Sequence, residues 1–152
     1  MRNIRAIIVL CLMLAVAGIA TAQVTQSEAS RKLDEFSGSN CEDMMAHLDS
    51  YAIALQSEPD LRAYIIVYGG QTSQRNEAQM WASRARSYLV GNRAIAAKRI
   101  TTSVGGYREN PTMELWLVRK DAPLPVAKPT VQLKDVKFKS GRIKKLEYRC
   151  GI

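Results

Sequence analysis

Residues 112–119 have the sequence TMELWLVR, and their alternating side chains form the clearest strand pattern in the chain. One face of an extended chain would carry the apolar residues Met113, Leu115 and Leu117. The opposite face would carry a mixed set, Thr112, Glu114, Trp116 and Val118. The pattern predicts a strand over 112–119 that is covered on at least one face.

Two earlier stretches also have the composition of strands. Residues 63–68 (AYIIVY) are β-rich and apolar, which predicts a short strand buried on both faces. Residues 98–104 alternate apolar and polar side chains, which predicts a second strand. A weaker strand is expected to end near Phe36. Gly69-Gly70 and Gly105-Gly106 are expected to form tight turns after their strands.

Helical spacing appears in two segments between these strands. Residues 41–57 carry apolar side chains at intervals of three and four, after a plausible N-cap at Asn40. The expected buried stripe is Met44, Leu48, Tyr51 and Leu55. Residues 76–90 predict a second helix, with Gly91 as its C-terminal cap.

Strands and helices in this order predict an α+β fold of βαβαββ type, with both helices packed on one face of a mixed sheet and a basic C-terminal extension. The predicted parts are a signal peptide (1–22), a flexible lead (23–32), the domain (33–119), a proline-rich linker (120–130) and a basic tail (131–152). The tail could form a hairpin around Ser140-Gly141.

The N-terminus has the pattern of a secretory signal peptide. Arg2 and Arg5 precede an apolar run over 6–17, and Ala20-Thr21-Ala22 fits a cleavage site before Gln23. The alternative is a membrane anchor, but the apolar run is shorter than the roughly 20 residues that a span needs. The sequence therefore predicts an exported protein in the periplasm or at the outer membrane.

Three cysteines are present, and Cys11 would leave with the signal peptide. Cys41 and Cys150 would remain in an oxidising compartment, where two thiols commonly pair. We favour a bridge between them; the alternative is two inert thiols. A bridge that closes so long a loop would stabilise the fold by about 4–5 kcal/mol in the chain-entropy model.

The positive charge lies at the C-terminus. The chain has 22 basic and 14 acidic residues, yet residues 23–119 contain 11 of each, and residues 120–152 contain nine basic and three acidic residues. Behind a proline-rich linker, this charge would stand apart from a neutral domain. Lys137, Lys139, Lys144 and Lys145 are the predicted contacts to an anionic surface. The alternative is a solvated tail that keeps the protein soluble.

The order of elements and several segments resemble an OmpA-like domain, the periplasmic module that binds peptidoglycan. The resemblance covers about 33–119 and includes the strand at 64–69, the segment ARSYLV at 85–90, the segment IAAKRI at 95–100, the turn GGYRENP at 105–111 and the strand at 113–118. The Gly-Tyr-x-Glu-x-Pro turn is similar to that family's Gly-x-Gly-Glu-x-x-Pro segment. The resemblance implies the fold predicted above and a place near the cell wall.

The residues that hold the wall peptide in that family are missing. Its Asp after the second strand grips an ammonium group, but residues 68–72 here have the sequence YGGQT. Its Arg, eight residues before a Leu on the next helix, corresponds to Trp81. A zwitterion needs both charges to offset its desolvation. Thr72, Arg75 and Arg84 are the nearest candidate ligand-binding residues.

The inventory of side chains favours a non-enzymatic protein without a cofactor or a metal. His47 is the one histidine, and an Asp43–His47 pair on a helix is expected to be a surface contact. Trp81 and Trp116 could stack on sugar, but both are expected in the core. Nothing in the sequence assembles a nucleophile, a base and an oxyanion donor.

The predicted function is that of an exported envelope protein whose OmpA-like domain acts near the cell wall and binds peptidoglycan weakly. The alternative is an interaction module that kept the fold, lost peptidoglycan binding and contacts another protein or an anionic surface. The expected partners are peptidoglycan or another envelope component, with anionic lipid as an option and nucleic acid excluded by export.

Overall fold

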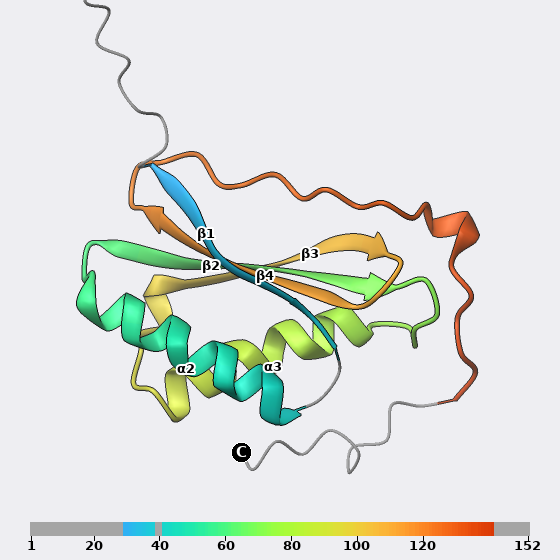
Figure 1. Ribbon diagram of the computed structural model, residues 1–152, viewed down its shortest axis with the longest axis horizontal. Helices are drawn as coiled ribbons and strands as arrows, with labels where there is room; N and C mark the ends of the chain where they lie inside the picture. Colours follow the sequence, from blue (N-terminus) through green and yellow to red (C-terminus); the bar gives the residue numbers. More distant parts are fainter. Residues whose placement is uncertain (1–28, 39–40, 142–152) are drawn as a thin grey trace, which may run out of the picture.

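The computed structural model describes residues 29–38 and 41–141 (Figure 1). The elements follow in the predicted order: β1 (Ser30–Ser37), α2 (Cys41–Ser57), β2 (Leu61–Gly70), α3 (Glu77–Gly91), β3 (Ile100–Arg108) and β4 (Thr112–Arg119). The boundaries predicted for the first helix and the last strand are confirmed. The signal peptide, its cleavage site and Asn40 lie outside the described residues.

The four strands form one mixed sheet in the order β1-β4-β2-β3. The crossover through α3 makes β2 and β3 parallel, and β4 runs antiparallel to both β1 and β2. Both helices cover the same face of the sheet (Figure 1). The predicted α+β fold of βαβαββ type is confirmed.

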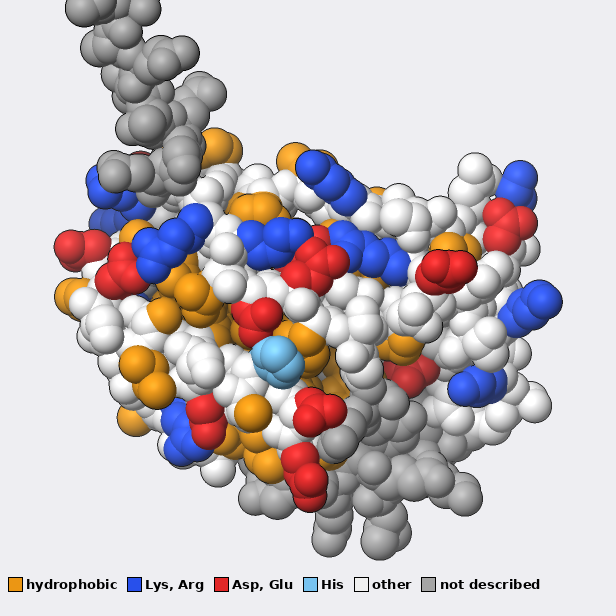
Figure 2. All heavy atoms as spheres, in the orientation of Figure 1, with side chains coloured by type: hydrophobic (Ala, Val, Ile, Leu, Met, Phe, Trp, Pro, Cys, Tyr) orange, Lys and Arg blue, Asp and Glu red, His pale blue; other side chains and the backbone are white. Residues whose placement is uncertain are grey.

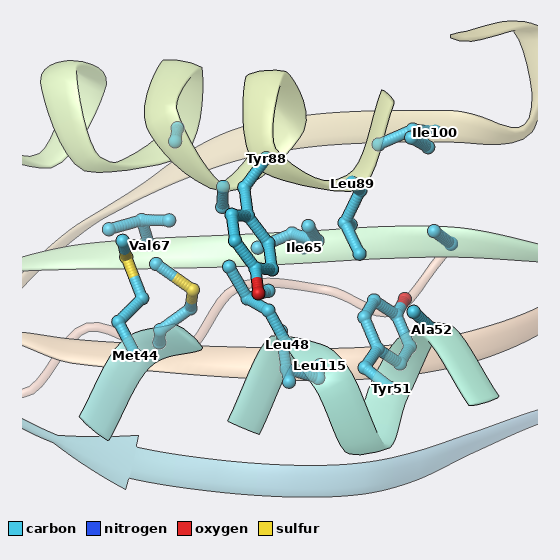
Figure 3. Close-up of a cluster of buried hydrophobic side chains, with 14 of the residues drawn as sticks. Met44, Leu48, Tyr51, Ala52, Ile65, Val67, Tyr88, Leu89, Ile100 and Leu115 are labelled. Atoms are coloured by element: carbon cyan, nitrogen blue, oxygen red, sulfur yellow. The ribbon is translucent and has the colours of Figure 1, made fainter. Parts of the chain in front are cut away.

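The main core lies between this face and the helices (Figure 3). Met113, Leu115 and Leu117 of β4 enter it, as their alternation predicts, and meet apolar side chains of α2, α3 and β2. Full burial of one such side chain contributes about 1.5–3 kcal/mol. Val118 belongs to a second, smaller cluster on the other face.

The predicted flexible lead is too long by three residues. Ser30, Arg31 and Lys32 belong to β1 and pair with Val118, Leu117 and Trp116 of β4. Most of β1 is exposed or half-buried, so its side chains give no periodic apolar signal. Backbone pairing with β4, rather than burial, therefore sets the start of this strand.

Neither glycine pair forms the tight turn that was predicted after its strand, because Gly69-Gly70 are the last paired residues of β2 and Gly105-Gly106 lies inside β3. The register with β2 shifts here, since Val67 pairs with Val104 and Gly69 pairs with Tyr107. A Cβ atom on Gly105 would lie 2.5 Å from the Tyr68 ring. The two glycines therefore form a bulge that lets the strand pass close to Tyr68.

Two helix-related boundaries also differ from prediction. Gly91 is the last residue of α3, and the capping residue is Asn92, whose amide donates to the Tyr88 carbonyl. A short 3-10 helix, Ala97–Arg99, delays the start of β3 to Ile100. In the part of the chain that the structure describes, no helix has the length and apolar character needed to cross a bilayer.

Candidate functional site

A C-terminal strap, residues 120–139, covers the face of the sheet that the helices leave open. It leaves β4 and runs back over the sheet as an extended chain with one 3-10 turn, η3 (Leu133–Asp135) (Figure 1). Ala122 and Ala127 pack on the second apolar cluster. The cluster itself consists of Tyr64, Ile66, Tyr68 and Val118. The segment predicted as a linker is therefore seated on the domain.

A charged network lies on this face and is centred on Glu114 of β4, which is 4% exposed. Its Oε1 accepts from Arg108 Nη2 at 2.5 Å, and its Oε2 accepts from Trp116 Nε1 at 2.9 Å. Arg108 also donates to Glu35 Oε1 at 2.8 Å. Hydrogen-bonded pairing of this kind is what a buried carboxylate needs to offset its lost hydration.

The surroundings fix the charge of each group in this network. Burial raises the pKa of Glu114, but the bonds from Trp116 and Arg108 outweigh it and leave the pKa below its usual value. Burial lowers the pKa of Arg108, but the bond to Glu114 and the electrostatic effects of Tyr68, Glu114 and Glu35 together more than reverse this effect and leave the pKa above its usual value. The pKa of Tyr68 is raised, mainly by burial. Around neutral pH the network is a fixed ion pair with a neutral phenol.

The network binds the strap through the peptide groups of Lys128. The Lys128 amide donates to the Tyr68 hydroxyl at 3.0 Å, and Arg108 Nε donates to the Lys128 carbonyl at 3.3 Å. Arg108 lies flat enough over Tyr68 to place its Cζ atom 3.7 Å from the ring centroid. Thr130 and Val131 then donate their amides to the Tyr107 carbonyl, both at 3.0 Å. These contacts hold the first half of the strap.

The second half of the strap binds the loop between β2 and α3. The Lys137 amide donates to the Gln71 carbonyl at 2.8 Å, and the Lys139 amide donates to the Ser73 carbonyl at 3.0 Å. Between them, the Phe138 ring meets the Tyr107 ring edge to face, with centroids 5.8 Å apart. Arg75 covers the Phe138 ring, with its Cζ atom 4.5 Å from the centroid.

The three predicted ligand-binding residues do not converge on one pocket. Thr72 and Arg75 are exposed in the β2–α3 loop, and Arg75 is engaged with Phe138. Arg84 lies on α3, where its Cζ atom is 5.5 Å from the centroid of the Trp81 ring. The contacts of Phe138 were missed because they join segments far apart in the chain. The sequence signal that could have pointed to Phe138 was its position as an aromatic residue between two lysines.

Two of the four predicted anionic-surface contacts, Lys137 and Lys139, have exposed side chains. Their backbone is bound to the domain, so the expectation that the charge stands apart from it is wrong for this part of the tail. Residues 131–138 also form no hairpin arm, because they contain η3 and one isolated bridge, Tyr107–Val131. Lys144, Lys145 and the second predicted arm lie outside the described residues.

His47 pairs with Asp34 of β1 rather than with Asp43. Its Nδ1 atom lies 2.5 Å from Asp34 Oδ2, and its ring stacks on Phe36 with centroids 4.1 Å apart. The helix therefore meets β1 through this residue. Cys41 opens α2, whereas Cys150 lies outside the described residues, so the bridge stays a prediction.

The two tryptophans differ in burial. Trp81 is 4% exposed in the main core, as expected, whereas Trp116 is half-buried on the opposite face of the sheet, beside the second apolar cluster. Over the described ranges, no three His, Cys, Asp or Glu side chains lie close enough together to hold a metal ion. Among the described residues, the most highly charged cluster of side chains is the network of Glu114 and Arg108. This network binds the strap.

Comparisons with models of known families, with curated proteins and with solved structures give no significant match.

Proposed function

We propose that this protein is an exported, non-enzymatic envelope protein with an OmpA-like domain, and that it contacts an anionic surface of the envelope through the strap. The observation that carries the proposal is the presentation of the strap lysines. Lys128, Lys134, Lys137 and Lys139 are all exposed, and among the described residues no acidic side chain forms an ion pair with any of them.

A fixed backbone makes such lysines more effective than those of a free tail. Hydrogen bonds from Lys128, Thr130, Val131, Lys137 and Lys139 hold the strap in one path, so binding need not order it again. Figure 2 shows lysine and arginine side chains projecting from the strap side of the molecule. Polyanions and anionic headgroups attract such charges without a specific pocket.

The resemblance to OmpA-like domains supports the location near the cell wall. The order of elements is the one it implies, and the segment GGYRENP joins the end of β3 to β4. Weak binding of the peptidoglycan peptide at the β2–α3 loop is the second candidate function. It is less favoured, because that loop lacks the family's gripping charges and its Gln71 and Ser73 carbonyls already bind the strap.

The test is sedimentation with peptidoglycan sacculi and with vesicles of anionic or neutral lipid. Changing Lys134, Lys137 and Lys139 to Gln should weaken binding to anionic material by about tenfold, because three exposed charges are lost. The matched control changes Arg62, Arg86 and Lys98 to Gln, which removes the same charge from exposed positions outside the strap. An equal loss of binding in both variants would show that the effect depends on net charge alone and would contradict a specific role of the strap.

Salt separates this proposal from a pocket. Surface attraction is screened within about 8 Å at physiological ionic strength, so binding should fall steeply between low and moderate salt. Binding that ignores both salt and the lysine changes would place the site on the domain and favour the second candidate. Comparison of sacculi with anionic vesicles identifies which polyanion is preferred.

Export and the disulfide have their own tests. N-terminal sequencing of exported protein should give Gln23 as the first residue, and a chain that still begins at Met1 would overturn the signal peptide. Mass spectrometry without reduction should show Cys41 and Cys150 joined in one cross-linked fragment. Full alkylation of both thiols without a reductant would contradict the bridge.

A further inference from the structure

The strap is attached as two separate clips. The first, residues 122–131, is held by the apolar cluster, by the Lys128 peptide groups and by the bonds to the Tyr107 carbonyl. The second, residues 136–139, is held at the β2–α3 loop. Between them, the hydrogen bonds of η3 are internal, from Asp135 to Gln132 and from Val136 to Leu133. Leu133 there is 65% exposed.

An open cavity lies beside the end of the first clip and the start of η3. A cavity of about 550 Å³ is lined by strap residues 129–133 together with Gly106 and Tyr107. The second clip can leave the loop while the first clip stays bound, because among the described residues no hydrogen bond or ion pair joins residues 132–135 to the domain. Release would free the Gln71 and Ser73 carbonyls and uncover the Tyr107 ring, beside the already exposed Arg75 side chain.

The second clip is bound as an extended peptide is bound. Two amides two residues apart donate to two carbonyls two residues apart, which is half of the bonding that an added strand makes, since no amide of residues 71–73 donates back to the strap. The intervening Phe138 supplies the one aromatic anchor, held edge to face by Tyr107 and covered by Arg75. The lysine side chains on either side are exposed. Backbone and one aromatic ring thus carry the recognition.

We propose that the Gln71–Ser73 edge, with Tyr107 and Arg75, is a peptide-binding site for an extended segment of another protein that carries an aromatic residue, and that the chain's own residues 136–139 occupy it as a competing ligand. Its partner is recognised by main-chain addition and one aromatic side chain. The contact goes beyond attraction to an anionic surface, since it needs neither exposed lysines nor low salt.

The internal ligand sets the affinity that a partner needs. A tethered segment on a short linker has an effective concentration in the millimolar range. In the intact chain, a partner peptide must therefore displace a tethered segment whose effective concentration is millimolar. Weakening the clip should reveal the site without any change in the loop itself, because the competition is removed and the acceptor carbonyls stay in place.

The experiment uses the full chain and a labelled peptide of residues 130–141, with binding followed by fluorescence anisotropy at about 0.3 M salt to screen the lysines. The Phe138→Ala protein should bind this peptide at least about tenfold more tightly than the unchanged protein. A peptide with Ala in place of Phe138 should lose that gain. Leu133→Ala, an exposed change on the same strap, is the matched control and should behave as the unchanged protein.

Hydrogen exchange provides a second measurement that does not depend on the variant. Excess peptide added to the unchanged protein should speed exchange at the Lys137 and Lys139 amides and leave the Thr130 and Val131 amides as they were. The proposal is overturned if Phe138→Ala binds the peptide no better than the unchanged protein, or binds both peptides equally. Exchange that rises in both clips, or in neither, overturns it as well.

Discussion

Different kinds of interaction stabilise the two faces of the sheet. On the helix side, buried side chains of α2, α3, β2, β3 and β4 form one large apolar core. On the strap side, the apolar cluster has four buried members, and a buried ion pair and backbone hydrogen bonds do the rest. The same strand serves both faces, since Leu115 points into the core and its neighbour Glu114 into the charged network.

Because of this difference, one face of the sheet sets the stability of the fold and the other sets the attachment of the strap. Apolar burial is non-directional and adds up with area, so the helix face sets the stability of the fold. The strap side depends on a few directed bonds between partners that are distant in sequence, such as Arg108 with Glu35 and Tyr68 with Lys128. Loss of one directed bond should therefore loosen the strap before it unfolds the domain.

The largest effect is expected from a cavity on the helix face. Leu115→Ala removes a side chain with no exposed surface and should lower the free energy of unfolding by about 3–5 kcal/mol. Urea denaturation measures it. The matched control is Ile53→Ala on α2, which is 64% exposed and should change stability by less than about 0.5 kcal/mol. A cost below about 1 kcal/mol for Leu115→Ala would contradict the central place of this core.

A smaller loss is expected when the charged network is broken. Glu114→Gln leaves the Arg108 guanidinium beside an uncharged partner, with Glu35 as its remaining carboxylate. Breaking a buried pair typically costs 3–5 kcal/mol, and the second partner reduces the expected loss to about 2–3 kcal/mol. Glu109→Gln changes the same charge at an exposed site and is the control. Equal midpoints for the two variants would show that the pair does not stabilise the fold.

Tyr68→Phe should cost only about 1 kcal/mol, because it removes a single hydroxyl. That hydroxyl accepts from the Lys128 amide, so the distinctive result is faster hydrogen exchange at Lys128 with little change in the core amides. Tyr64→Phe in the same apolar cluster serves as control, since no hydrogen bond to the strap involves its hydroxyl in the described structure. Equal exchange at Lys128 in both variants would remove Tyr68 from the attachment of the strap.

The smallest effect is expected in the dependence of stability on pH. The pKa of Glu114 is lowered in the folded protein, so its contribution to stability is present above its ordinary value of 4.5 and is lost as the pH falls through the folded pKa. The stability of the unchanged protein should therefore decline more steeply below about pH 4.5 than that of Glu114→Gln. Denaturation at a series of pH values measures both slopes. Parallel slopes would mean that Glu114 titrates as it does in the unfolded chain.

Prediction succeeded where the signal was local. The stripe from Met44 to Leu55 and the alternation from Met113 to Leu117 both follow from the geometry of one element, and both core faces are confirmed. It failed at Ser30–Lys32, where strand pairing is independent of side-chain type. It failed again at Gly105-Gly106, whose role depends on the distant Tyr68 ring.

The candidate site was less accessible to prediction than the fold. Thr72 and Arg75 were placed in the loop that binds the strap, but the partner that reaches this loop, Phe138, was not anticipated. Glu114 carried a signal in its position between the apolar residues Met113 and Leu115. Its partner Arg108 could not be chosen from the sequence, because several arginines were equally available and only the turn after β3 brings this one across.

The order of the elements, the apolar faces of α2 and β4, and the place of the positive charge could be predicted from the sequence, because each depends on residues close together in the chain. The path of residues 120–139, over the open face of the sheet and on to the β2–α3 loop, is visible only in the folded structure. That path depends on bonds between residues such as Tyr68 and Lys128, or Gln71 and Lys137, which are roughly 60 residues or more apart. Local spacing carries no information on such pairs, since the free energy that selects them arises only when the sheet has formed.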